Sequence, residues 1–394
     1  MKRLLWLCTH RTQWREELPL LLEAGFEVVP AKWGHRDYPV HENPEDPYYI
    51  QSWRSQCTLP VALVEELRAV NWFHDAPSDM RALANQVFDA VIITSFPDTL
   101  LSFARWFSKS IFYRVFGLAG EGAYSDLFGA SGLQEVCASF VYQRNLYHWC
   151  PALPTLRQAE DPMLTRNEVV LQQFVSPERF PARWQKQQVE PYIAMVLSRV
   201  AEAGYYGDRY LAEVQYYGKL YRRIASRFRV GPETIPLRIA GQNQRGAFGD
   251  AEILGPLPEQ DFYGTIARAT AFFYQGESIC HFHLNAFEVV AMGVPVVMMQ
   301  SGYLAWLLAQ VAGPQARGQG YGVVEGLDEA RSLLARCLKN PELARAIAHR
   351  QRPLADYVTN RNRAIRLYRE RLHHVLDEAP KNNQRERAAW KQCA

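Results

Sequence analysis

The sequence has no run of about 18 uncharged apolar residues, so nothing in it predicts a transmembrane helix. Its opening, MKRLLWLCTHRTQ, is too short and becomes polar too soon for a signal peptide. We therefore expect a cytosolic protein. It also has little excess charge of either sign, with 44 Lys and Arg against 41 Asp and Glu. This balance argues against a nucleic-acid partner that is bound by bulk neutralisation of phosphates.

Cysteines are few and scattered. The chain has seven of them, an odd number, and no Cys-x-x-Cys pair. The spacing supports neither a disulfide framework nor a structural zinc site, and we interpret these residues as reduced thiols.

The length of 394 residues exceeds the size at which one hydrophobic core usually stops growing, so about two domains are expected. Apolar segments alternate with amphipathic ones, which is typical of parallel α/β construction. We predict a Rossmann-like domain over 1–170 and a second over 171–350. A C-terminal helix over 351–380 would cross back to the first domain, and 381–394 would form a polar tail.

The first half predicts a mostly parallel sheet with covering helices. Residues 36–60 interrupt the rhythm with prolines and tyrosines, and we interpret them as an inserted loop. The expected strands are LLWLCTH (4–10), GFEVVPA (25–31), 90–94, SIFYRV (110–115) and 135–142; the expected helices cover 14–22 and 61–69, and Pro97 opens a further one.

The second half repeats the pattern. Its expected strands are YIAMVLSR (192–199), LRIAG (237–241), a short one near 253, 271–274 and one from Val294. Its expected helices are a long one ending at Phe228, 262–269, one opening at about Leu284, 327–339, 341–351 and 354–376. Two open sheets in tandem would leave a cleft, and in such sheets ligands bind beyond the carboxyl ends of the strands.

The stretch SICHFHLNAFEVVAMGVPVVMM (278–299) is the most informative. A helix that opens at Leu284, just after a strand end, presents free backbone N–H groups and a positive dipole end, which suit a phosphate. Glu288 lies one turn further on and could accept hydrogen bonds from a ribose. Gly293 supplies a left-handed cap, and Pro295 prevents the helix from continuing.

Several segments together resemble the GT-B glycosyltransferases, particularly the retaining glycosyltransferase family 4. VVLQQFVSPERF resembles their interdomain linker, YIAMVLSR and LRIAGQN the first two strands of their nucleotide-binding domain, ILGPLPEQDFYGTIARATAFFYQ the stretch that passes the nucleotide base, and FEVVAMGVPVV the ribose-binding glutamate with its glycine-proline turn. The matches keep their family order from about Val169 to Val297. The resemblance implies two Rossmann-like domains whose parallel sheets face each other across a cleft.

The resemblance also assigns the donor site. It implies that Glu288 binds the ribose hydroxyls and that the backbone N–H groups near Leu284, Asn285 and Ala286 hold the distal phosphate. Arg199 matches the position that contacts the diphosphate. Arg245 or Arg238 is a possible second cation, in place of the lysine that the family usually has, and Leu257 lies where the family's backbone contacts the base. Each could instead be an ordinary structural or surface residue.

The sequence departs from the family at Cys280, where family 4 places the first acid of a glutamate pair. Glu277 or His283 could take its place at the donor sugar if the loop is shifted, and Ser278 and His281 are also near. The cluster of Cys280, His281 and His283 allows a metal interpretation, although a polar wall is the simpler one. The family implies that no metal or other cofactor is needed, because cations and a helix terminus neutralise the leaving diphosphate.

The resemblance implies an enzyme that moves a sugar from a nucleotide-sugar donor to a glycan, a lipid-linked or another hydroxyl acceptor. The first domain would bind the acceptor, with His10 as a base if the reaction inverts. The alternatives are an epimerase of the same fold, an inverting transferase and a non-catalytic sugar-binding protein. Trp106, Lys109 and Phe112 could bring the protein to a membrane surface if the acceptor is lipid-linked.

Overall fold

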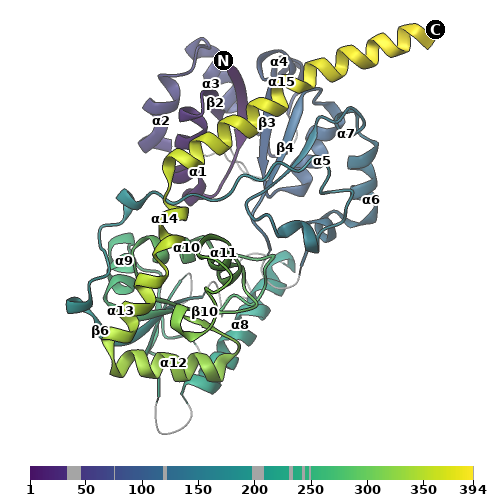
Figure 1. Ribbon diagram of the computed structural model, residues 1–394. Coiled ribbons are helices and arrows are strands. Elements are labelled where there is room, and N and C mark those ends of the chain that lie inside the picture. Colours follow the sequence, from purple (N-terminus) through teal and green to yellow (C-terminus); the bar gives the residue numbers. More distant parts are fainter. Residues whose placement is uncertain are drawn as a thin grey trace. The chain divides into compact units, whose positions relative to one another are not determined.

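The computed structural model describes residues 1–32, 46–74, 76–118, 122–197, 208–229, 234–241, 245–247 and 250–393. The chain forms two compact units (Figure 1). The first comprises Met1–Gly117, Gly122–Phe174 and Arg361–Ala394, and the second comprises Leu118–Glu121 and Val175–Asn360. The division at Phe174 falls inside the segment VVLQQFVSPERF.

The first unit is built on a five-stranded parallel sheet in the order β2-β1-β3-β4-β5. Its strands are β1 (Lys2–Leu7), β2 (Phe26–Pro30), β3 (Ala90–Thr94), β4 (Ser110–Val115) and β5 (Tyr147–Pro151). Its helices are α1 (Arg11–Glu23), α2 (Asp46–Arg54), α3 (Val61–Ala69), α4 (Ser78–Val87), α5 (Pro97–Trp106), α6 (Tyr124–Ala138), α7 (Phe140–Gln143) and α15 (Arg361–Cys393).

Strands β2 to β5 are buried along their whole length, as expected for a parallel sheet that is covered on both faces. Helices α1 and α15 share one hydrophobic core with this sheet. Leu18 and Leu21 of α1 pack in it together with Tyr368 and Leu372 of α15. The last helix of the chain is therefore part of the first unit, whose other elements lie at least 187 positions earlier in the sequence.

The second unit contains a six-stranded parallel sheet in the order β11-β10-β9-β6-β7-β8. Its strands are β6 (Glu190–Val196), β7 (Leu237–Ala240), β8 (Ile253–Gly255), β9 (Ala269–Tyr274), β10 (Val296–Met299) and β11 (Val323–Val324). Its helices are α8 (Asp208–Phe228), α9 (Glu259–Arg268), α10 (Leu284–Ala291), α11 (Tyr303–Ala312), α12 (Leu327–Lys339), α13 (Pro341–Arg350) and α14 (Arg352–Val358).

Alternate residues of this second sheet contribute to one core. Ile193 and Met195 of β6 and Phe273 of β9 pack with side chains of α8 and α12, such as Ile224 and Leu333. The connection after β6 leads through α8 to β7 on one side, while the connection after β9 leads through α10 to β10 on the other. The carboxyl ends of β6 and β9 therefore form a topological switch point, where open α/β sheets bind ligands.

Four sequence-based expectations about structure were wrong. Residues 135–142 are not a strand, because α6 runs to Ala138 and α7 begins at Phe140; the strand at this point is β5. Part of the predicted loop 36–60 is the helix α2. The single helix expected over 354–376 is divided, because α14 ends at Val358 and α15 begins at Arg361; α15 then runs on through the predicted polar tail to Cys393.

None of the helices that the structure describes combines the length and the apolar character that a membrane crossing requires. Phe112, which the sequence suggested for a membrane surface, lies inside β4 and is fully buried. A side chain in the middle of a covered parallel sheet cannot reach a lipid surface, so this residue has no such role.

Candidate donor site in the second unit

The switch point of the second unit is fixed by a side chain at the end of β9. The buried Gln275 donates a hydrogen bond from Nε2 to the carbonyl oxygen of Val196 at the end of β6, at 3.0 Å. The two strand ends are thereby held together where their connections diverge. Arg199, the predicted diphosphate contact, follows β6 but lies outside the described residues.

Helix α10 begins at Leu284, where the sequence predicted it. His283 is the N-cap, with extended backbone angles, and within the described chain its side chain makes no capping hydrogen bond. Phe282 packs against Phe287 with ring centroids 4.2 Å apart. This contact between the residue before the N-cap and the fourth helical residue is a hydrophobic staple, which fixes where the chain enters the helix.

The first turn of α10 contains Leu284 and Asn285, which are half-buried, and Ala286, which is fully buried. Ala286 donates its N–H to the carbonyl of His283 at 3.0 Å. The first amides of a helix have no intrahelical acceptor and carry a partial positive charge. The helix ends as predicted, with Gly293 at a φ of 81°, a left-handed angle that favours glycine.

The loop between β9 and α10 is held from several sides. Tyr303 of α11 donates its N–H to the carbonyl of Ser278 at 3.1 Å, and Cys280 donates its N–H to the Ser278 hydroxyl at 3.1 Å. Gly302 lies so close to the carbonyl oxygen of Gly276 that a β-carbon there would collide with it. The loop therefore depends on the start of α11 for its shape.

Glu277, the predicted substitute for the missing acid, forms an ion pair with Arg223 of α8 at 2.6 Å. Both side chains are substantially exposed, at 35% and 48% respectively. Exposed pairs of this kind are usually weak, so Arg223 holds Glu277 only loosely.

His283 is half-buried and belongs to a polar group at the amino end of α10. Its Nε2 lies 2.7 Å from the hydroxyl of Tyr217, a buried residue of α8, and 3.2 Å from Nε2 of His281. Burial lowers the pKa of His283 to about 4, and burial followed by the proximity of His283 places the pKa of His281 well below its usual value. Both imidazoles are therefore neutral at pH 7 and can donate or accept single hydrogen bonds.

The described part of the chain brings no three His, Cys, Asp or Glu side chains together as a metal ion would require. His281 and His283, which alternate along the chain and lie on one side of it, therefore form a histidine pair whose further partner is Tyr217.

Glu288 is 7% exposed and lies one turn into α10. It forms an ion pair with Arg179, which ends a single 3-10 turn, η2 (Pro177–Arg179), at the start of the second unit. The same Nη2 of Arg179 also donates to the hydroxyl of Tyr263 of α9, at 2.8 Å. Burial raises the pKa of Glu288, while the charge of Arg179 and the hydrogen bonds from Arg179 and Tyr263 act in the opposite direction.

The remaining predicted residues lie apart from this group in the chain. Leu257 is half-buried in the connection between β8 and α9, and Arg245 is exposed in a turn after β7. His10 is the N-cap of α1 in the first unit, and its side chain is exposed. The structure thus brings Glu288, His283 and the first turn of α10 together on one helix.

Sequence reasoning missed the partners of these residues. Arg179 is the third residue of Pro-Glu-Arg-Phe, a segment that the sequence suggested only as a linker. Tyr263 and Tyr217 look like ordinary apolar positions of helices. The sequence held no signal for this role of Arg179, because an arginine requires a carboxylate partner only where folding buries it.

No known family model matches this sequence, and no curated protein matches it. Solved structures do resemble the model. HepE of Anabaena in complex with UDP superimposes with a TM-score of 0.59 at 12% identity, over 95% of this chain and 100% of that one.

Two further structures are similar. A mutant O-GlcNAc transferase of Thermobaculum terrenum gives a TM-score of 0.58 at 15% identity, over 97% of this chain and 69% of that one. A glycosyltransferase of Rickettsia africae gives 0.54 at 10% identity, over 97% and 99%. At such identities the likeness shows the fold alone. This chain has the GT-B glycosyltransferase fold, with two Rossmann-like domains built on parallel sheets.

Proposed function

We propose that this protein is a glycosyltransferase that takes a sugar from a nucleoside diphosphate sugar and holds this donor at the amino end of α10. The observation that carries the proposal is the position of this helix. It starts at the carboxyl edge of β9, at the switch point beside β6, and has a buried carboxylate, Glu288, one turn from its start. Free helical amides suit a phosphate, and an ionised carboxylate suits the hydroxyl groups of a ribose.

The chemistry follows from the charges that develop during glycosyl transfer. The sugar ring becomes positive and the departing diphosphate becomes negative, so the site must stabilise negative charge on the phosphates. In this proposal the amides of Leu284 and Asn285 do so, with Arg199 and Arg245 as side-chain cations. The amide of Ala286, which the sequence also suggested, already donates to the carbonyl of His283. The backbone at Leu257 contacts the base, and no metal is required.

The donor sugar lies, in this proposal, against the loop between β9 and α10. His283 and Glu277 are its candidate contacts, in place of the acid that family 4 has at the position of Cys280. A neutral His283, with its Nε2 close to the Tyr217 hydroxyl, serves as a hydrogen-bond partner of sugar hydroxyls. It is too weak a base, with a pKa of about 4, to remove a proton from an alcohol at pH 7.

The acceptor hydroxyl must lose a proton during the reaction. In a retaining reaction of the kind that family 4 implies, the leaving phosphate takes this proton, and no protein nucleophile is needed. In an inverting reaction His10 of the first unit would be the base. We assign acceptor binding to this first unit and expect a glycan or a lipid-linked hydroxyl compound.

Nucleotide titration tests the proposal directly. Isothermal calorimetry of the full chain with UDP, GDP, ADP and dTDP, without added metal, should show binding of at least one of them. Failure of all four to bind would refute the donor assignment. Turnover of the matching nucleotide sugar should then require an acceptor extract, whereas interconversion of the sugar without any acceptor would identify an epimerase.

A further inference from the structure

The contact between Arg179 and Glu288 gives the linker a role at the nucleotide site. We propose that Arg179 is a positioning residue, which sets the orientation and the charge of the Glu288 carboxylate that a nucleotide meets. This inference rests on the proposed function, since it concerns the same donor site. Arg179 itself need not touch the nucleotide.

The geometry fixes the carboxylate from one side. The Nη2 group of Arg179 donates to both Glu288 Oε1 and the Tyr263 hydroxyl, and the Tyr263 hydroxyl also hydrogen-bonds to Glu288. Tyr263 is almost fully buried. Donors from two different elements, η2 and α9, therefore meet this carboxylate, and an ionised carboxylate has more acceptor positions than these two donors use.

The charge state of Glu288 also depends on Arg179. A buried carboxyl group without a partner prefers its neutral form. The neutral form carries a hydroxyl donor in place of one acceptor, so it is a poorer partner for the two hydroxyls of a ribose. Arg179 opposes this effect of burial, whereas Glu259 at the start of α9 reinforces it. The positive charge of Arg179 thus offsets both the desolvation of Glu288 and the negative charge of Glu259.

Arg179 is held in place by the residues that follow it. Phe180 packs edge-on against the ring of Tyr263, with centroids 5.1 Å apart. Arg183 donates to the carbonyl of Ala291 at the end of α10 and, at 2.6 Å, to the carbonyl of Pro177. The linker is therefore fastened at both ends of the segment that carries Arg179.

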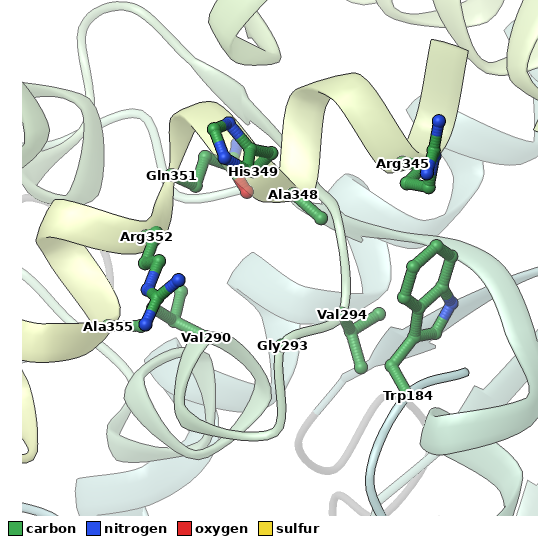
Figure 2. Close-up of a pocket in the computed structure, with 10 residues that line it drawn as sticks. All are labelled: Trp184, Val290, Gly293, Val294, Arg345, Ala348, His349, Gln351, Arg352 and Ala355. Carbon is green, nitrogen blue, oxygen red and sulfur yellow. The ribbon is translucent and has the colours of Figure 1, made fainter. Parts of the chain in front are cut away.

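Trp184 completes this attachment. Its backbone N–H donates to the carbonyl of Met292 at 3.1 Å, and its indole N–H donates to the carbonyl of Ala269 at 2.9 Å. Figure 2 shows its side chain beside Val294, on the wall of a pocket of about 260 Å³. A positioning residue on a segment with this many contacts loses little conformational entropy when the ligand binds.

The pH dependence of nucleotide binding tests the inference. Affinity of the wild-type protein should fall as the pH is lowered through the pKa of Glu288. In Arg179→Gln the pKa of Glu288 rises further, so the loss should begin at a higher pH, and affinity at pH 7 should fall roughly tenfold. Arg179→Lys keeps the charge and should keep the midpoint close to the wild-type value, with an intermediate affinity.

Arg268→Gln at the end of α9 is the matched control, because it removes an exposed arginine of the same unit whose partner is Glu190 and not Glu288. Its pH midpoint should equal that of the wild type. If Arg179→Gln proves unstable, Tyr263→Phe keeps the ring against Phe180 and should move the midpoint in the same direction by less.

The outcomes separate the two proposals. A wild-type protein that binds no nucleotide refutes the proposed function, and this inference with it. A wild-type protein that binds, together with an Arg179→Gln profile of unchanged midpoint, refutes only the role of Arg179. A shift of similar size in Arg268→Gln would also refute it, because the effect would then not be specific to the partner of Glu288.

Discussion

Arg179 and Glu288 are 109 positions apart in the sequence and form a largely buried ion pair within the second unit. One residue ends the short turn that opens this unit, and the other lies on the helix at its switch point. A buried charged pair is costly to form and stabilises little by itself, but removing one partner leaves an uncompensated charge. The pair therefore connects the fold of the linker to the chemistry of the candidate site.

Glu288→Gln should weaken nucleotide binding, because the amide replaces one acceptor oxygen with a donor and cannot accept both ribose hydroxyls. We expect a loss of affinity of roughly tenfold, the factor typical of a lost hydrogen bond to a charged group. Calorimetric titration of UDP and GDP measures it. Arg179 would then lack its carboxylate partner, so the variant should also unfold at a lower denaturant concentration.

A control for this change is Glu342→Gln on α13, where the carboxylate is exposed and paired with Arg345 at 2.7 Å. Its nucleotide affinity should match that of the wild type. Equal affinities of Glu288→Gln and the wild-type protein would argue that ribose recognition does not involve this carboxylate.

The start of α10 could be predicted from the sequence, whereas the partners of its residues could not. A helix start is a local property, set here by the extended N-cap His283 and by the staple between Phe282 and Phe287. The partner of Glu288 depends on where a distant turn lies after folding, and no local pattern encodes that. The strands β3 and β4 were predictable for a related reason, since fully buried parallel strands appear as continuous apolar runs.

The segment EVCASFVY (135–142) shows where such reasoning fails. Its β-branched and aromatic residues favour a strand by propensity, but propensity is a weak guide when tertiary packing decides. Leu133 and Val136 are buried three residues apart on α6, and Val141 is buried on α7. The hydroxyl of Ser139 accepts a hydrogen bond from the N–H of Tyr142 as the cap of α7. A serine that starts a new helix after a short break was the missed signal.

The first unit contains a buried pair of a different kind. Arg114 of β4 and Glu17 of α1 are both at most 1% exposed, with Nε and Oε1 2.9 Å apart, and the Tyr368 hydroxyl of α15 donates to the same Oε1 at 3.1 Å. Arg114→Met should destabilise this unit by about 3 to 5 kcal/mol, because it leaves the carboxylate buried without its cation. Urea unfolding followed by far-UV circular dichroism measures the change.

The double change Glu17→Met with Arg114→Met is the informative control. Replacing both charged groups with apolar ones removes the uncompensated charge, so the double variant should be more stable than Arg114→Met alone. If the double variant lost as much stability as the two single changes together, packing and not the uncompensated charge would determine the cost of Arg114→Met.

The two histidines before α10 should make stability depend on pH. The pKa of His283 is about 4 in the folded chain, below its ordinary value of 6.5. Between these two pH values the unfolded chain therefore binds a proton at His283 and the folded chain does not. This contribution to stability is complete above about pH 6.5 and is lost as the pH falls toward 4. His283→Gln removes it, so the stability difference between wild type and variant should be smaller at pH 5 than at pH 7.5. An equal difference at both pH values would contradict a buried neutral imidazole.

Gly302 at the start of α11 lies directly against the backbone of Gly276. A β-carbon at position 302 would collide with the Gly276 carbonyl oxygen, and this part of the loop is backbone that cannot rotate away as a side chain could. Gly302→Ala should therefore displace the loop between β9 and α10, with a cost of about 1 to 3 kcal/mol from overpacking. Nucleotide affinity should fall with it, because the amino end of α10 follows this loop directly.

The matched change is Gly264→Ala in α9, where nothing lies within 4 Å of the added carbon. That variant should gain up to about 1 kcal/mol from helix propensity and keep its affinity. Thermal unfolding and nucleotide titration of the two variants distinguish the effects, and equal behaviour of both would show that the loop does not depend on this close approach.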